Sequence, residues 1–158
     1  MKKNIYRWKL RISTLLLASF LLFSSNAIAQ SPSTLLGSVS NSDQAWVNSS
    51  CPRSLGPSLW SNCVRREVSA IRQGIPGLSE LQPNARSWIL QSCPRSLGPS
   101  LYKNCITREK AAILNGLPSF SGISDEDRRW VNSSCPRSLG PSLWSNCVRR
   151  EVSALRGL

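Results

Sequence analysis

The cysteines of this chain recur at a fixed spacing, which constrains the fold more than any other feature. Two cysteines twelve residues apart occur three times, and each pair repeats 42 residues after the previous one. The phrase CPRSLGPSL starts at each first cysteine, at 51–59, 93–101 and 135–143. A fixed period of this length is typical of repeat proteins, in which each repeat is one supersecondary unit. We therefore expect three copies of one small unit.

Each unit has the start and stop signals of two helices. The first helix is expected to begin at a capping box, at Ser40 or Ser124, or at the first-turn proline Pro83. It should end at the first cysteine, because the next residue is proline. The Gly-Pro of the phrase then opens a second helix, which closes at Gly74 or Gly116 in the first two units. The sequence predicts an all-α fold of three tandem αα-hairpins.

The first 29 residues have the organisation of a secretory signal peptide. Basic residues precede an apolar run at 14–23, and the small-residue pattern Ala-Ile-Ala follows at 27–29. The apolar run is only about half of the ~20 residues that span a bilayer. We expect cleavage after Ala29 and release into the periplasm or the medium, with no integral membrane segment. The predicted organisation is a signal peptide, an N-terminal linker and three repeats, at 1–29, 30–39, 40–78, 79–120 and 121–158.

Export makes disulfides the expected state of the cysteines, because the compartment is oxidising. Six cysteines allow fifteen pairings, and three local bridges fit a unit that is copied three times. A bridge of this span contributes roughly 3 kcal/mol on the loop-entropy model. A unit of ~40 residues is marginal without such a staple. The expected pairs are Cys51–Cys63, Cys93–Cys105 and Cys135–Cys147.

One glutamate per unit lies within the apolar half of the second helix. A carboxylate there is costly unless it is paired or protonated. The nearest candidate partner is the arginine that follows Cys-Pro. We expect structural ion pairs, and a buried catalytic acid is the less favoured alternative because no second carboxylate recurs nearby. The expected pairs are Arg53–Glu67, Arg95–Glu109 and Arg137–Glu151.

The composition argues against catalysis and against metal binding. The chain contains no histidine, which removes the commonest base and the commonest metal ligand. The recurring serines have no base to activate them, and cysteines twelve residues apart do not match structural zinc sites. We expect a non-enzymatic protein with no cofactor and no metal.

The candidate binding residues are arginines and tryptophans. Removing the leader takes away five cations and no acid, which leaves fifteen cations against eight acids and a net charge of +7. The arginines of the second helices form either a solvated basic face or a polyanion-binding stripe that unit two interrupts. The tryptophans either pack over the disulfides or stack on a ligand. These residues are Arg65, Arg72, Arg149, Arg156, Trp46, Trp60, Trp130 and Trp144.

The pattern W-x(4)-CPRSLGPSL-[WY]-x-N-C-x-x-R-E resembles cysteine-paired segments of uncharacterised exported bacterial proteins. The resemblance covers residues 40–158 and implies the compartment and the module, without an activity. Tandem copies raise avidity without any new contact. We therefore expect an exported binding module for an acidic or cell-envelope partner, either a protein or a polyanion, with nucleic acid a less favoured partner. The alternative is an envelope protein that stabilises or inhibits another exported protein, and an enzyme is the third and least favoured interpretation.

Overall fold

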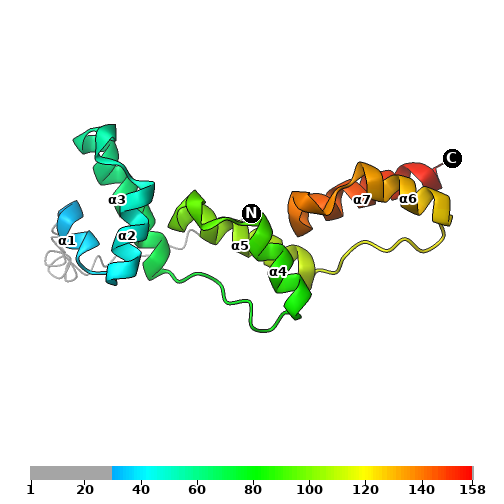
Figure 1. Cartoon of the computed structure of the whole chain (residues 1–158), viewed down its shortest axis with the longest axis horizontal. Coiled ribbons are helices and arrows are strands. Elements are labelled where there is room, and N and C mark those ends of the chain that lie inside the picture. The colour runs from blue at the N-terminus through cyan, green and yellow to red at the C-terminus, as the bar shows by residue number, and fades with distance from the viewer. Residues whose placement is uncertain (1–29, 158) are drawn as a thin grey trace, which may run out of the picture.

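The computed structural model describes residues 30–157, and these fold into three αα-hairpins in a row (Figure 1). The predicted all-α repeat fold is confirmed, and no strand occurs in this part of the chain. A short 3-10 helix forms the turn of every hairpin. The three hairpins are α2 (Asn41–Ser50), η1 (Arg53–Leu55) and α3 (Pro57–Arg72); α4 (Pro83–Ser92), η2 (Arg95–Leu97) and α5 (Pro99–Leu114); and α6 (Asp125–Ser134), η3 (Arg137–Leu139) and α7 (Gly140–Arg156).

The first helices begin at the predicted caps. The Ser40 hydroxyl accepts a hydrogen bond from the Asp43 backbone N–H at 3.2 Å, and Ser124 accepts from Asp127 at 3.0 Å. Pro83 occupies the first turn of α4, where its missing N–H has no consequence. One further helix, α1 (Pro32–Leu36), lies within the segment predicted as a linker. The predicted signal peptide lies outside the described residues.

The phrase CPRSLGPSL builds the turn of each hairpin. Its glycine has a φ of 82° at Gly56, 81° at Gly98 and 83° at Gly140, a region that side chains with a Cβ rarely adopt. The proline that follows is the first residue of α3 and of α5, and the second of α7. The glycine therefore turns the chain sharply, and the proline starts the second helix.

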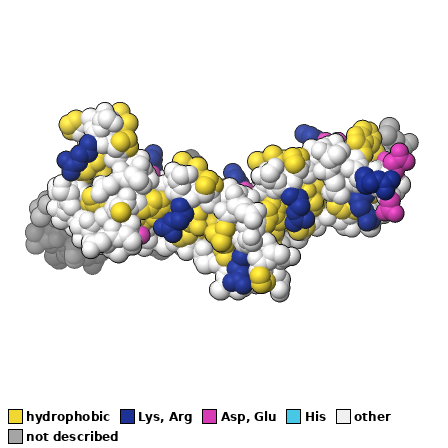
Figure 2. Space-filling model, in the orientation of Figure 1, with side chains coloured by type: hydrophobic (Ala, Val, Ile, Leu, Met, Phe, Trp, Pro, Cys, Tyr) yellow, Lys and Arg dark blue, Asp and Glu magenta, His cyan; other side chains and the backbone are white. Residues whose placement is uncertain are grey.

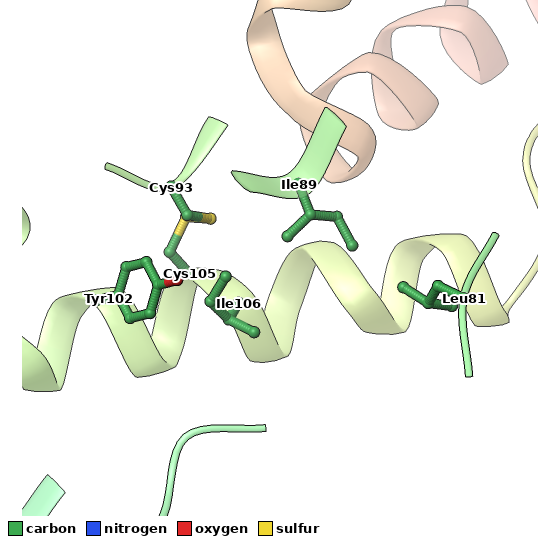
Figure 3. Close-up of a cluster of buried hydrophobic side chains, with 6 residues drawn as sticks. All are labelled: Leu81, Ile89, Cys93, Tyr102, Cys105 and Ile106. Atoms are coloured by element: carbon green, nitrogen blue, oxygen red, sulfur yellow. A yellow bond between two sulfur atoms is a disulfide. The ribbon is translucent and has the colours of Figure 1, made fainter. Parts of the chain in front are cut away.

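The three predicted disulfides are present. Cys51–Cys63, Cys93–Cys105 and Cys135–Cys147 have Cα–Cα distances of 5.7, 5.8 and 5.8 Å, within the usual range for a disulfide. A small apolar core surrounds each bridge, and Figure 3 shows the core of the second hairpin, where Ile89 and Ile106 are fully buried beside the bridge. Each disulfide thus ties the end of the first helix to the second helix.

The segment before each hairpin packs onto that hairpin. Leu36 and Val39 lie against the core of the first repeat. The positions 42 residues later, Leu78 and Leu81, join the core of the second repeat, and Phe120 and Ile123 join that of the third. The second helices contact one another in order, α3 with α5 and α5 with α7. None of the helices in residues 30–157 is both long and apolar enough to cross a membrane.

Candidate interaction surface

The glutamates of the first and second repeats each reach into the following repeat. Glu67 is 2% exposed, and its carboxylate accepts the Ser100 backbone N–H at 2.6 Å and the Ser100 hydroxyl at 2.8 Å. Ser100 lies in the first turn of α5, where backbone N–H groups have no partner within the helix. Glu67 therefore caps a helix of the following repeat, and its negative charge lies at the positive end of that helix dipole.

The second joint repeats this geometry. Glu109 is 1% exposed and accepts the Ser142 backbone N–H at 2.6 Å in the first turn of α7. In both joints the preceding arginine, Arg66 or Arg108, donates to the same carboxylate at 2.9 Å. The buried charge is thus satisfied by a helix terminus on one side and by a partly solvated guanidinium on the other.

The predicted pairing of these glutamates with the arginines of the phrase is wrong. The Arg53 guanidinium lies over the Trp60 ring at 4.9 Å, and Arg95 and Arg137 lie over the tryptophan of the preceding repeat. The carboxylates instead bind Arg66, Arg108 and Arg150, and each of these arginines immediately precedes its glutamate in the sequence. The physical reason is that Glu67 and Glu109 point from the second helix towards the following repeat, where helix N–H groups are available. The predicted pairs that the structure replaces are Arg53–Glu67, Arg95–Glu109 and Arg137–Glu151.

The first tryptophans of the first and second repeats also belong to the joints. The Trp46 indole N–H donates to the Arg95 carbonyl at 2.8 Å, and its ring meets the edge of Tyr102 with centroids 5.5 Å apart. The Arg95 guanidinium stacks on the same Trp46 ring at 4.0 Å from its centroid. Such a cation–π contact adds roughly 0.5–2 kcal/mol according to its exposure. The tryptophan therefore anchors the turn of the next repeat.

Trp88 makes the same contacts across the second joint. Its indole N–H donates to the Arg137 carbonyl at 2.7 Å, and the Arg137 guanidinium lies 3.9 Å from its centroid. Its ring meets the edge of Trp144, with centroids 5.5 Å apart. Trp144 is buried in the core of the third repeat, and Trp60 is half-buried against the core of the first. The two tryptophans of a repeat thus have different surroundings.

The turn glycines allow the backbone of one repeat to approach the first helix of the repeat before it. A Cβ added at Gly98 would lie 2.8 Å from the Ser50 hydroxyl, and one at Gly140 would lie 2.9 Å from that of Ser92. Each joint therefore has two parts. We call Trp46, Ser50, Glu67 and their copies the Trp–Glu face, and we call Arg53–Ser58, Arg95–Ser100 and Arg137–Ser142 the turn faces.

The joint between the first two repeats forms an open groove of about 360 Å³. Two cationic side chains, Arg66 and Lys103, line it together with the exposed Leu101. No carboxylate belongs to its lining, which consists of Arg66, Ser69, Ala70, Gln73, Ser100, Leu101, Lys103 and Asn104. Arg108 and Leu143 are the equivalent residues of the second joint, while Ser145 replaces the lysine. Arg66 also binds the Glu67 carboxylate and Lys103 donates to the Gln73 side-chain oxygen, so an anionic group in the groove would meet the remaining N–H groups of these two cations.

The arginines of the predicted basic stripe are exposed, and three of the four also make local contacts. Arg72 donates to the Ser38 hydroxyl, Arg149 to the Gly116 carbonyl at 3.2 Å and Arg156 to the Ser121 carbonyl at 2.7 Å. Each contact ties a second helix to the segment that precedes its hairpin. Arg65 has no such contact with described residues and remains a solvated cation. Figure 2 shows that Lys and Arg side chains are spread along the array rather than gathered at one place.

The sequence did not reveal that Ser100, Ser142 and Trp88 are joint residues. The available signal was that unit two keeps the serine and glycine of the phrase while other positions change. Among residues 30–157, no cluster of three His, Cys, Asp or Glu side chains is arranged to hold a metal ion. No family model, curated protein or solved structure matches this chain.

Proposed function

We propose that the mature chain is an exported, non-enzymatic binding module that presents a repeated basic surface to an acidic partner of the cell envelope. The observation that carries this proposal is the groove between the first two repeats. Arg66 and Lys103 line it, no carboxylate does, and Leu101 supplies an apolar contact beside them. A planar guanidinium and an ammonium in one groove suit carboxylate, sulfate or phosphate groups.

The charge and the compartment support the same function. A net charge of +7 after removal of the leader attracts polyanions over a range of about 8 Å at physiological salt. Three disulfides are typical of exported proteins, and the sequence of residues 1–29 directs export. The joints hold neighbouring repeats in one orientation, so a partner with several acidic groups can contact several repeats at once. Avidity then strengthens contacts that are individually weak.

The experiment is retention of the disulfide-bonded mature chain on immobilised heparin, measured against salt. The double variant Arg66→Gln/Lys103→Gln removes the two cations of the groove. The matched control Arg65→Gln/Arg129→Gln removes two exposed cations that lie outside it. We expect the groove variant to elute at clearly lower salt, with a salt slope smaller by about 1–2, while the control changes less.

Two results would contradict the proposal. The first is the absence of retention on heparin at physiological salt. The second is an equal loss of retention in the two double variants, which would mean that the anion does not bind in the groove. Binding to one exported protein that does not depend on salt would instead support the alternative function, stabilisation or inhibition of that protein.

A further inference from the structure

The array ends in two faces that the described residues leave uncovered. At the C-terminal end, Trp130 is 63% exposed, whereas its copy Trp88 is 8% exposed. The Glu151 side chain is 35% exposed and binds only Arg150 among the described residues, whereas Glu67 and Glu109 cap a following helix. A pocket of about 130 Å³, lined by Trp130, Ser134 and Glu151 among others, lies where a further turn face would fit.

At the N-terminal end, the complementary turn face of the first repeat, Arg53–Ser58, is also free of described contacts with another repeat. Gly56 would meet no described atom within 4 Å if it carried a Cβ, whereas its copies Gly98 and Gly140 are packed against a serine. Pro57 is exposed, whereas Pro99 and Pro141 are buried. Helix α1 does not cover this face, because the contact of Ser38 with Arg72 places the segment after α1 at the opposite end of α3. Figure 1 shows the start of α3 projecting away from α1.

Each free face has the same sequence as a face that is already docked within the chain. Residues 46–70 and 130–154 are identical. The free Trp–Glu face of the third repeat thus has the same sequence as the Trp–Glu face of the first repeat, which docks on the turn face of the second repeat. The free turn face of the first repeat has the same sequence as the turn face of the third repeat, which binds the Trp–Glu face of the second repeat. Every contact of a new joint therefore has a precedent, including a Trp–Trp edge contact, here between Trp130 and Trp60.

We propose that the mature chain binds a second copy of itself head to tail, with Trp130 and Glu151 of one copy docked on the turn face Arg53–Ser58 of the next. In this joint the Glu151 carboxylate accepts the backbone N–H of Ser58, and the indole N–H of Trp130 donates to the Arg53 carbonyl. A copy that uses one face still has the other free, so the contact is heterologous and produces a series of oligomers rather than a closed dimer. Assembly of this kind also creates a further inter-repeat groove at every new joint.

Concentration decides whether the joint forms between copies. Within the chain a short linker holds the two faces at an effective concentration on the order of millimolar. Separate copies lack this advantage, so association should rise steeply as the protein approaches that range. Sedimentation velocity of the disulfide-bonded mature chain, from dilute solution to the millimolar range, should show monomer giving way to dimer and then to larger species.

Two variants each disable one face. Trp130→Ser removes the exposed anchor of the Trp–Glu face, and it leaves the monomer intact because the side chain makes few contacts there. Ser58→Glu places a carboxylate where Glu151 of the other copy must bind, and in the monomer an acid is favourable in the first turn of α3. We expect each variant alone to stay monomeric throughout the range. Leu90→Ser, which removes an exposed leucine away from both faces, should associate like wild type.

Mixing the two disabled variants is the sharpest test. Trp130→Ser retains a working turn face, and Ser58→Glu retains a working Trp–Glu face, so an equimolar mixture should form a 1:1 dimer and nothing larger. A variant that had merely misfolded cannot give this result. The proposal is overturned if wild type stays monomeric in the millimolar range, if either variant associates like wild type, or if the mixture contains no dimer.

Discussion

Glu67 and Glu151 form a matched pair, because they occupy the same place in identical stretches of sequence. Their surroundings in the structure differ in whether another repeat covers the carboxylate. Glu67 is buried against the second repeat, and Glu151 has no repeat after it among the described residues. Replacing each of them with glutamine therefore measures the joint and leaves local helix propensity nearly the same in both variants.

The expected magnitude comes from the contacts of the carboxylate. Glu67 accepts two hydrogen bonds from Ser100 and one from Arg66. The Arg66 side chain is 65% exposed, so its ion pair contributes about 1 kcal/mol at most. Hydrogen bonds to a buried charged group contribute about 1.5–3 kcal/mol each. Glutamine keeps one accepting oxygen but turns an NH₂ group towards the remaining donors, so Glu67→Gln should cost about 2 kcal/mol. Glu151→Gln loses only an exposed pair and should cost less than about 0.5 kcal/mol.

The assay is urea unfolding of the oxidised mature chain at a concentration low enough to keep it monomeric. Because neighbouring repeats stabilise one another, a weakened joint lowers the unfolding midpoint or splits the transition. A double-mutant cycle of Glu67→Gln with Ser100→Ala should be non-additive, since the two side chains share a bond. Equal costs for Glu67→Gln and Glu151→Gln would refute the joint. So would a larger cost for Arg53→Ala, which is the result that an Arg53–Glu67 pair requires.

Three further tests each address a single contact of the structure. Gly98→Ala and Gly56→Ala impose the same strain at positive φ, but only Gly98→Ala drives a Cβ into Ser50. Gly98→Ala should therefore unfold at lower urea and lower the free energy of unfolding by about 1–3 kcal/mol more than Gly56→Ala. Equal unfolding midpoints for the two variants would contradict this contact. A hydrogen bond from Lys110 holds the pKa of Glu80 below its ordinary value, so Lys110→Gln should raise that pKa in a carboxyl NMR titration, and an unchanged titration would contradict the contact. Because the pKa of Glu80 is lower in the folded state, its contribution to stability is present above the unfolded pKa and is lost as the pH falls through the folded pKa. Replacing Cys93 and Cys105 together with alanine should lower the free energy of unfolding by about 3 kcal/mol in the same urea assay, and an unchanged midpoint would show that the bridge does not constrain the unfolded chain.

Local signals in the sequence were sufficient for the architecture. The capping serines, the Cys-Pro helix stop and the Gly-Pro restart each act within a few residues, and helices begin or end at all of them in the structure. The disulfide pairing was equally accessible, because of the fifteen possible pairings three local bridges best fit a unit copied three times. These features depend on backbone conformation and short loops, which neighbouring residues determine.

The tertiary structure decided what the buried glutamate of a second helix contacts. Helical periodicity placed Glu67 within the apolar half of its helix, but it could not show whether its own turn or another repeat covers it. The answer depends on how two hairpins stack, and that depends on the close approach of Gly98 to Ser50 and on the free N–H groups at the start of α5. A carboxylate binds where unpaired N–H groups and a helix dipole coincide. Here they coincide 33 residues further along the chain.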